Sequence, residues 1–255
     1  MTDSRTSLVI ATKLVSSDEA GWFFRLLPDA AEGGGYFRSA LRQGIGPGLD
    51  VDPERAGREA GRRARTEVRR YAAANRLNRL GTLTYRGAGC FDPQTVRRDA
   101  GRFFRGLSRA LGGKRFPYVW VPEWHPKGHG LHVHFAVGRF IGQRMMERTW
   151  GHGWVHIVLI GDVPVGAGVL GESRKAGRYL AKYVGKDFAS GRVAGLHRYE
   201  VGQGFQPRHE IFRGVTVELV LAAASDRMKE QPSYVWHSSE VVDWQGPPAV
   251  MAQWL

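Results

Sequence analysis

The chain has almost no cysteine. Cys90 is the single one among 255 residues, so no disulfide can form within the chain, and no CxxC pair is present to hold structural zinc or to run redox exchange. A chain of this length buries enough apolar surface to fold without such crosslinks. These features favour one good-sized domain, or one domain with added segments, in the reducing environment of the cytoplasm.

Long apolar runs are also missing. No uninterrupted apolar stretch is long enough to cross a bilayer. The first residues include Asp3 and contain too short an apolar stretch for a secretory signal. We therefore expect a soluble, cytoplasmic protein without a membrane partner.

Acidic residues are the minority charge. The chain has 24 Asp and Glu against 37 Lys and Arg, which gives a formal net charge of +13. Such an excess predicts a polyanionic partner. Nucleic acid is the leading candidate because the eight Trp, eight Tyr and twelve Phe residues offer stacking surfaces. A basic surface that is merely solvated is the alternative, and charge alone does not exclude it.

The sequence patterns predict an α+β fold. We expect a central, mainly antiparallel sheet of about five strands with flanking helices, in a layer sandwich. Periodicity and turn residues predict the order strand, helix, strand, strand, helix, strand, helix. The expected strands span residues 79–87, 116–125, 130–138 and 153–161, and the expected helices span residues 92–111, 141–151 and 172–188.

The expected domain lies at residues 53–210. Residues 1–52 are predicted to be an N-terminal extension or linker, because residues 27–52 are rich in Gly and turn formers. A strand or short helix is possible at residues 7–15. We expect the helix and tail of residues 211–255 to pack on the central domain.

A long, Arg-rich helix is predicted from Pro53, with Asp52 as its N-cap. Only Val68, Tyr71 and Ala72 mark an inner face on it. The remaining face either contacts DNA phosphates or is a solvated arm, and the pattern leaves both readings open.

A hairpin with several histidines is predicted around "PEWHPKGHGLHVHFAVG". Alternate residues of a strand share a face, so His132 and His134 point the same way. A turn near residues 127 and 128 places Glu123 opposite His132, and Val121 opposite His134. One carboxylate beside two imidazoles makes a workable three-ligand metal site with open positions. The alternative is an exposed strand face without a metal; His125 and His129 are weaker candidates, a loop side chain and a group that supports the ligands.

Two tyrosines in "RYLAKYVGKDF" are spaced four residues apart. Helical spacing places Tyr179 and Tyr183 between an apolar stripe and a basic one, with both hydroxyls able to reach the same point. A tyrosine titrates near ~10, so a nucleophilic phenolate needs a cation such as a lysine or a metal. The alternative is an ordinary boundary between core and solvent. The apolar stripe is Leu180, Val184 and Phe188, and the basic one is Lys182 and Lys186.

Three segments resemble the ordered motifs of HUH endonucleases. They are "TLTY" (82–85), "EWHPKGHGLHVH" (123–134) and "YLAKYVGK" (179–186). The closest resemblance is to the two-tyrosine rolling-circle replication initiators (Rep proteins) of bacterial plasmids and small single-stranded DNA phages. Histidines before tyrosines match these initiators, whereas conjugative relaxases carry their tyrosine upstream. The resemblance covers roughly residues 78–190, with one residue more between Glu123 and His132 than in the phage initiators.

The resemblance implies a palm-like HUH fold and a function. In such enzymes Mg²⁺ or Mn²⁺ is held here by His132, His134 and Glu123, and Tyr179 or Tyr183 attacks single-stranded DNA. The products are a 5′-phosphotyrosine link and a free 3′-hydroxyl that initiates rolling-circle replication. The basic residues Lys182 and Lys186 stabilise the phenolate or phosphate charge.

The implied partners are an origin hairpin in single-stranded DNA, a host helicase and a polymerase. Imidazole ligands are softer than Mg²⁺ prefers, which favours Mn²⁺. Two alternatives remain open: an HUH transposase or mobilisation relaxase, and a non-catalytic module that binds zinc and DNA.

One further motif is predicted to have no catalytic role. The segment "GAGVLGES" (166–173) satisfies GxGxxG, but Glu172 stands where a phosphate-binding loop needs lysine. We expect a flexible loop there.

Overall fold

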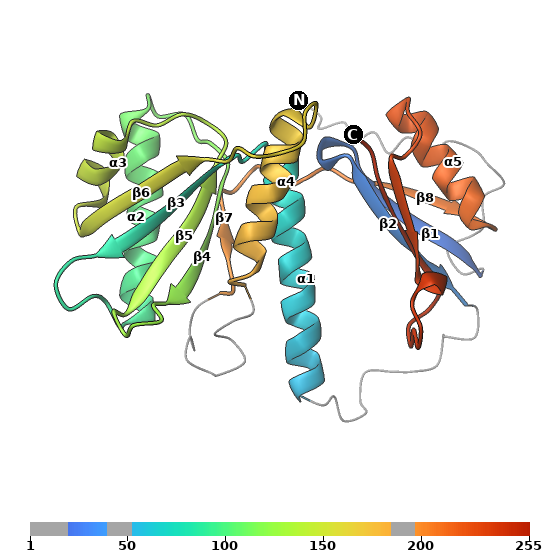
Figure 1. Ribbon diagram of the computed structural model, residues 1–255, viewed down its shortest axis with the longest axis horizontal. Coiled ribbons are helices and arrows are strands. Elements are labelled where there is room, and N and C mark those ends of the chain that lie inside the picture. The colour runs from blue at the N-terminus through green and yellow to red at the C-terminus, as the bar shows by residue number, and fades with distance from the viewer. Residues whose placement is uncertain (1–19, 40–52, 185–196) are drawn as a thin grey trace, which may run out of the picture. The chain divides into compact units, whose positions relative to one another are not determined.

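The computed structural model describes residues 20–39, 53–184 and 197–255. The chain forms two compact units. The central unit is Val51–Gln206, and the terminal unit combines Met1–Asp50 with Pro207–Leu255. Within the described residues the two units contain two five-stranded antiparallel sheets and five α-helices (Figure 1). The α+β class is confirmed, and the second sheet was not expected from the sequence.

The central unit has the predicted order of elements. Its sheet has the strand order β6-β3-β5-β4-β7, in which every neighbouring pair is antiparallel. The short β7 pairs with β4 at one edge. The elements are α1 (Pro53–Ala74), β3 (Arg79–Tyr85), α2 (Pro93–Ala110), β4 (Tyr118–Trp124), β5 (Leu131–Val137), α3 (Gln143–Trp150), β6 (Gly153–Leu159), α4 (Gly168–Ala181) and β7 (Glu200–Val201).

The central sheet is the middle of three layers. Figure 1 shows α2 and α3 on one face and α1 and α4 on the other. Alternation along β5 explains the two cores, because Val133 and Phe135 enter the core beneath α2 and α3 while Ala136 enters the core beneath α1 and α4. The face covered by α1 and α4 is also the face of His132 and His134, so the helices on this side decide how much of the histidines remains open.

Helix α1 packs on the sheet with its predicted inner face. Val68 and Ala72 have no exposed surface, and Tyr71 is buried as well. The hydroxyl of Tyr71 donates a hydrogen bond to the carbonyl of Gly202, with an O–O distance of 2.9 Å. Since this contact joins α1 to the segment beside β7, α1 is part of the central core. Among the described residues, no helix is both long enough and apolar enough to span a membrane.

Gly81 lies where β3 passes under the ring of Phe135. A Cβ atom at position 81 would overlap that ring, which has no exposed surface and no room to move aside. We expect Gly81→Ala to lower the free energy of unfolding by about 1–3 kcal/mol. Gly57 in α1 is the matched control, because its Cβ would meet no atom, and Gly57→Ala should stabilise by about 0.5–1 kcal/mol. Urea unfolding of both variants tests this, and an unchanged midpoint for Gly81→Ala would contradict it.

The terminal unit has its own sheet, with the order β8-β1-β2-β10-β9. β1 pairs with β2 and β8, and β10 pairs with β2 and β9. Its elements are β1 (Gly21–Leu27), the 3₁₀ turn η1 (Pro28–Ala30), β2 (Glu32–Arg38), β8 (Glu210–Gly214), α5 (Val217–Met228), β9 (Tyr234–His237), the 3₁₀ turn η3 (Ser238–Glu240) and β10 (Ala249–Gln253).

The expected loop over residues 27–52 is wrong for residues 27–38. This segment contains η1 and β2, and the glycines of β2 are required by packing rather than by a turn. The ring of Phe24 lies against Gly33, where any side chain would overlap it. Gly35 lies equally close to the backbone of Phe23 and Phe24. Residues 7–15 and 40–52 lie outside the described residues.

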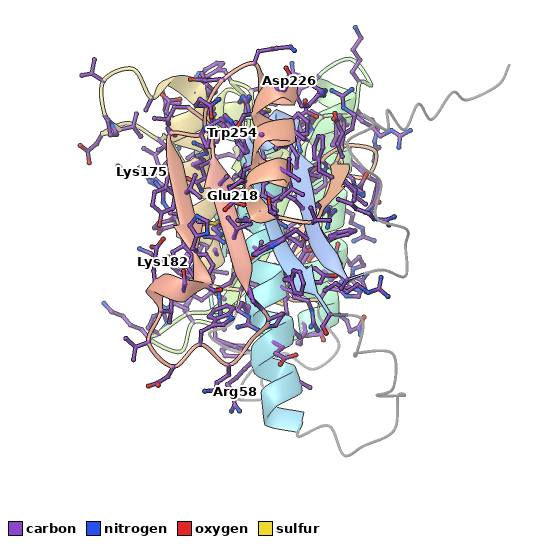
Figure 2. The ribbon with its side chains drawn as sticks, turned by 90° about the vertical axis from the view of Figure 1, so that its right-hand side faces the viewer. Arg58, Lys175, Lys182, Glu218, Asp226 and Trp254 are labelled. Atoms are coloured by element: carbon purple, nitrogen blue, oxygen red, sulfur yellow. The ribbon has the colours of Figure 1, made fainter. Side chains whose placement is uncertain are left out.

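The terminal segments are grouped differently from the expectation. Residues 1–52 were expected as an extension and residues 211–255 as a tail on the central domain, but the hairpin β1–β2 forms one sheet with β8 and β10. The physical reason is that this hairpin has two open edges, and each takes a strand from the C-terminal segment. Trp254, labelled in Figure 2, is 1% exposed, and its indole N–H donates to the carbonyl of Glu230 at 2.9 Å.

Candidate active site

The hairpin β4–β5 has the register that the sequence predicts. Glu123 is opposite His132, and Val121 is opposite His134. On the other side of β5, Thr82 of β3 is opposite His134. Glu123, His132 and His134 therefore share one face of the sheet, in the middle of the central unit.

His134 is held through both ring nitrogens. Its Nε2 lies 2.7 Å from Oε2 of Glu123, and its Nδ1 lies 3.1 Å from the hydroxyl of Thr82. Both His134 and Glu123 are buried, with 8% and 7% of their surface exposed. Since the Thr82 hydroxyl can donate or accept, it accommodates either tautomer of the His134 ring.

His132 has a buried nitrogen without a hydrogen-bond partner. Its Nε2 is the unpartnered atom, while its Nδ1 lies 3.5 Å from the Thr84 hydroxyl. Burial, together with the neighbouring histidines, lowers the pKa of His132 to about 4, so its ring is neutral near pH 7. An unpartnered buried polar group costs about 1–3 kcal/mol. Such an atom is typical of a site that binds an ion or a substrate group.

Two further imidazoles lie beside His132. His125, which was expected to be a loop side chain, stacks on His132 with ring centroids 4.5 Å apart. The Nε2 of His129 lies 3.1 Å from the carbonyl oxygen of Tyr85, so this ring ties the hairpin turn to the end of β3. The turn histidine thus supports the site, as the sequence suggested, and His125 contacts it more directly than expected.

The residues fit a divalent ion in their donor types. Two imidazole nitrogens and one carboxylate are ligands for an ion of borderline softness, and the buried Nε2 of His132 has no competing partner. As the side chains are placed, however, no three His, Cys, Asp or Glu residues of the described segments are arranged to hold a metal ion. Closing the set would require the 2.7 Å contact between Glu123 and His134 to open.

The two tyrosines lie at the end of α4, over the histidine face. The ring of Tyr183 stacks on that of His134, with centroids 4.2 Å apart and an interplanar angle of 11°. The Tyr183 hydroxyl donates a hydrogen bond to the Tyr179 hydroxyl at 2.9 Å. Both hydroxyls therefore reach one point, and that point lies beside the histidines.

The tyrosine helix differs from its expected span of 172–188. It starts at Gly168, so part of the expected loop 166–173 is helical, and it ends at Ala181. Tyr183 lies in the following turn, where its N–H bonds to the carbonyl of Leu180 at 3.0 Å. The predicted stripe is buried at Leu180 and Val184, which fixes the turn on the sheet. Lys186 and Phe188 lie outside the described residues.

The two tyrosines have different surroundings. Tyr179 is 39% exposed, whereas Tyr183 is partly buried. Burial raises the pKa of Tyr183, and its hydrogen bond to Tyr179 raises that pKa further. The ammonium of Lys182, labelled in Figure 2, is exposed and lies 5.6 Å from the centroid of the Tyr179 ring.

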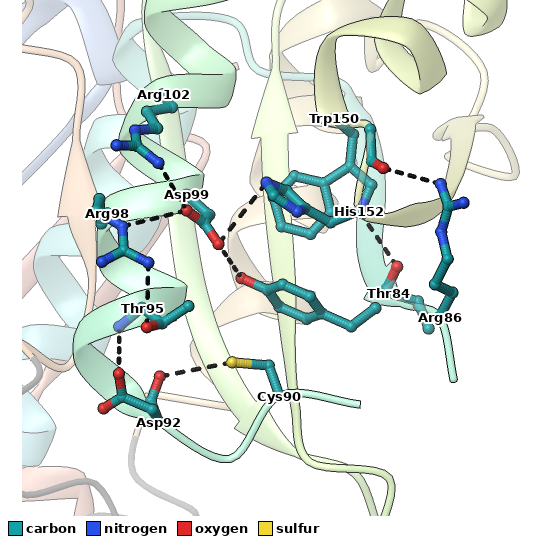
Figure 3. A network of polar contacts seen from close by, with 12 residues as sticks. Thr84, Arg86, Cys90, Asp92, Thr95, Arg98, Asp99, Arg102, Trp150 and His152 are labelled. Atoms are coloured by element: carbon teal, nitrogen blue, oxygen red, sulfur yellow. Dashed lines mark hydrogen bonds and ion pairs between the residues drawn. The ribbon is translucent and has the colours of Figure 1, made fainter. Parts of the chain in front are cut away.

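A buried carboxylate supports the strand that carries the threonines. Asp99 of α2 is 4% exposed and accepts a hydrogen bond from the hydroxyl of Tyr85 at 3.3 Å (Figure 3). Burial, and next the charge of Asp99, raise the pKa of Tyr85. This contact anchors the end of β3, whose carbonyl at Tyr85 receives His129. The cations around the carboxylate are Arg98, Arg102 and His152.

The catalytic motifs thus occupy one continuous segment, from β3 to the turn after α4. Residues 78–188 match the family model of the replication-associated protein ORF2. The matched segment includes Thr82, Glu123, His132, His134 and the tyrosine pair. Similarity to replication-associated proteins therefore concerns the part of the chain that builds the site.

The match to the ORF2 family covers less than half of the chain and leaves out the whole terminal unit. No curated protein and no solved structure matches the chain at a significant level. The similarity to the ORF2 family is therefore the comparison on which a functional proposal rests.

Sequence reasoning identified the histidines and tyrosines but not their partners. Thr82 and Thr84 belong to the "TLTY" motif, and their pairing with His134 and His132 follows only from the β3–β5 register. Asp99 looked like an ordinary helix residue. Its place three residues after Val96, on the buried side of α2, was the available signal.

Proposed function

We propose that this protein nicks single-stranded DNA at a specific site and transfers the strand through a 5′-phosphotyrosine intermediate, initiating rolling-circle replication. The observation that carries the proposal is the stacking of Tyr183 on His134 with its hydroxyl bonded to Tyr179. It brings a pair of potential nucleophiles to a potential ion site. The similarity of residues 78–188 to replication-associated proteins supports the same reading.

In this proposal His132, His134 and Glu123 hold Mg²⁺ or Mn²⁺, which when bound neutralises the charge of the scissile phosphate. Thr82 keeps the His134 ring in place, accepting a proton at Nδ1 when Nε2 must offer its lone pair. His125 and His129 limit the movement of His132 and of the hairpin turn.

The strand is cut by transesterification. The Tyr179 oxygen forms a bond to phosphorus and the bond from phosphorus to the 3′-oxygen breaks. The phenol loses its proton, and the leaving oxygen gains one as a 3′-hydroxyl. Number and type of bonds are conserved, so no oxidant or reductant is needed. Tyr183 repeats the attack later in the cycle.

Tyr179 is the better first nucleophile. It is the more exposed ring, and it accepts the hydrogen bond that Tyr183 donates, which stabilises a developing phenolate. Lys182 adds a positive charge beside the same ring. Lys186 is proposed to contribute likewise, on the grounds of its sequence spacing alone. A host helicase and polymerase supply unwinding and synthesis.

A covalent adduct tests the proposal. The protein is incubated with a labelled origin-like oligonucleotide and Mn²⁺, and denaturing gels are examined for an SDS-resistant protein–DNA band. We expect the band in wild type and its loss in the double variant Tyr179→Phe with Tyr183→Phe. An undiminished band in that variant contradicts the assigned nucleophiles.

The same gel separates the rival functions. A module that only binds DNA gives salt-sensitive binding and no covalent band. A transposase or mobilisation relaxase gives a band, but on its own DNA end instead of a replication origin.

A further inference from the structure

A large aromatic side chain lies exposed on the same sheet face as the histidines. Trp154 belongs to β6, the edge strand next to β3, and is 62% exposed. The next residue, Val155, is buried in the core beneath α2 and α3. Alternation therefore directs Trp154 to the opposite face, which is the face of the site.

The strand registers place Trp154 in line with the site. Trp154 is opposite Thr84, and the Thr84 hydroxyl lies 3.5 Å from Nδ1 of His132. His132 is in turn opposite Glu123. One row across the sheet thus holds the carboxylate, the imidazole, the threonine and the indole. Neighbouring strands are about 4.8 Å apart, so the Trp154 backbone is roughly 10 Å from that of His132.

The helices that cover this face leave Trp154 open. Leu80 of β3 is on the same face, is buried beneath α1 and α4, and is 7% exposed. Trp154 is at the other end of the β3–β6 pair, beyond that cover. A large apolar ring kept in water beside a polar site is typical of a binding surface and not of a core.

The electrostatics favour an anionic occupant. The chain has a net charge of +13. The exposed cations Arg86, directly after β3, Lys127, in the hairpin turn, and Lys182, beside Tyr179, flank the histidine face. Glu123, the carboxylate in the row, is engaged with His134. A flat indole among cations suits a strand whose phosphates are anionic and whose bases have open π-faces.

We propose that the indole of Trp154 stacks on one base of single-stranded DNA, next to the phosphate that is cut at the histidines. The proposal rests on the proposed function and adds the position where the substrate strand is held. Duplex DNA does not offer an unstacked base, so the contact selects for single strands. Stacking accepts any base, so it holds the strand without reading its sequence.

Binding of a fluorescein-labelled single-stranded oligonucleotide, followed by anisotropy in EDTA, tests this contact without cleavage. We expect Trp154→Ala to weaken binding about 5- to 150-fold, the range for loss of one base–aromatic stack. Trp154→Phe should retain most of the affinity, and Trp154→Leu, which is apolar but not flat, should behave like Trp154→Ala. Phe140→Ala is the matched control, since Phe140 is 77% exposed on the loop beyond the opposite end of β5.

An abasic scan locates the base. Removing one base at a time should weaken wild-type binding at a position within one or two nucleotides of the cut, and the same position should have no effect in Trp154→Ala. Wild-type affinity in Trp154→Ala, equal loss in Phe140→Ala, equal loss on duplex DNA, or no position whose effect depends on Trp154 would each overturn the proposal. Circular dichroism confirms that the variants are folded.

The two proposals fail separately. A missing covalent band with an intact Trp154 effect contradicts the nicking function and leaves a strand-binding surface. A normal band together with unchanged binding by Trp154→Ala overturns the stacking contact alone.

Discussion

Replacing Tyr179 by phenylalanine should abolish the first cleavage, whereas replacing Tyr183 should leave it in place. Tyr179 is exposed beside Lys182 and accepts the hydroxyl proton of Tyr183 in a hydrogen bond. Phenylalanine has no oxygen to attack phosphorus, so the loss should reach on the order of 10³-fold or more. The rate of adduct formation on a 3′-labelled single-stranded oligonucleotide measures it.

The variant Tyr183→Phe is the matched control for this order of events. It keeps the ring stacked on His134 and removes only the hydroxyl. We expect a moderate fall in the first cleavage, because one donor to Tyr179 is lost, and failure of the second transfer. If Tyr183→Phe abolishes the adduct while Tyr179→Phe keeps it, the order of the tyrosines is reversed.

Removing the imidazoles should remove the ion. We expect His132→Ala and His134→Ala each to weaken Mn²⁺ binding by about 100-fold or more, because each deletes one of three proposed ligands. Thr82→Val should weaken it about 10- to 100-fold, the usual effect of losing the hydrogen bond that orients a ligand histidine. Calorimetric titration with Mn²⁺ measures these changes without DNA.

His156→Ala is the matched control for the ion site. His156 of β6 is exposed and opposite Thr82, so it shares the sheet face but is separated from His134 by β3. Its removal should leave Mn²⁺ affinity unchanged. Unchanged affinity in His132→Ala and His134→Ala would instead show that the histidine face has only a structural role.

The histidine face was predictable because its determinants are local. The turn at residues 126–129 fixes the register of two adjacent strands, and that register sets Glu123 opposite His132. The apolar stripe at Leu180 likewise predicted which side of the tyrosine helix is buried. In both cases a short stretch of chain contains the information.

The terminal sheet was not predictable for the opposite reason. Its strands come from both ends of the chain, and β2 is so rich in glycine that it lacks the alternation that normally indicates a strand. The same glycines are required by the ring of Phe24, a contact between strands that the sequence does not display. Trp154 was missed similarly, because its face depends on the β3–β6 register.

The division of the terminal sheet between the two ends of the chain has a consequence for the order of folding. The central unit is complete once residue 206 has been synthesised, and it can fold while the ribosome is still working. The hairpin β1–β2 is made earlier, yet it has no neighbours until β8 and β10 emerge. During synthesis its two open edges are therefore exposed to pairing with other chains, and truncation before β10 should produce aggregation even though the site-bearing unit is intact.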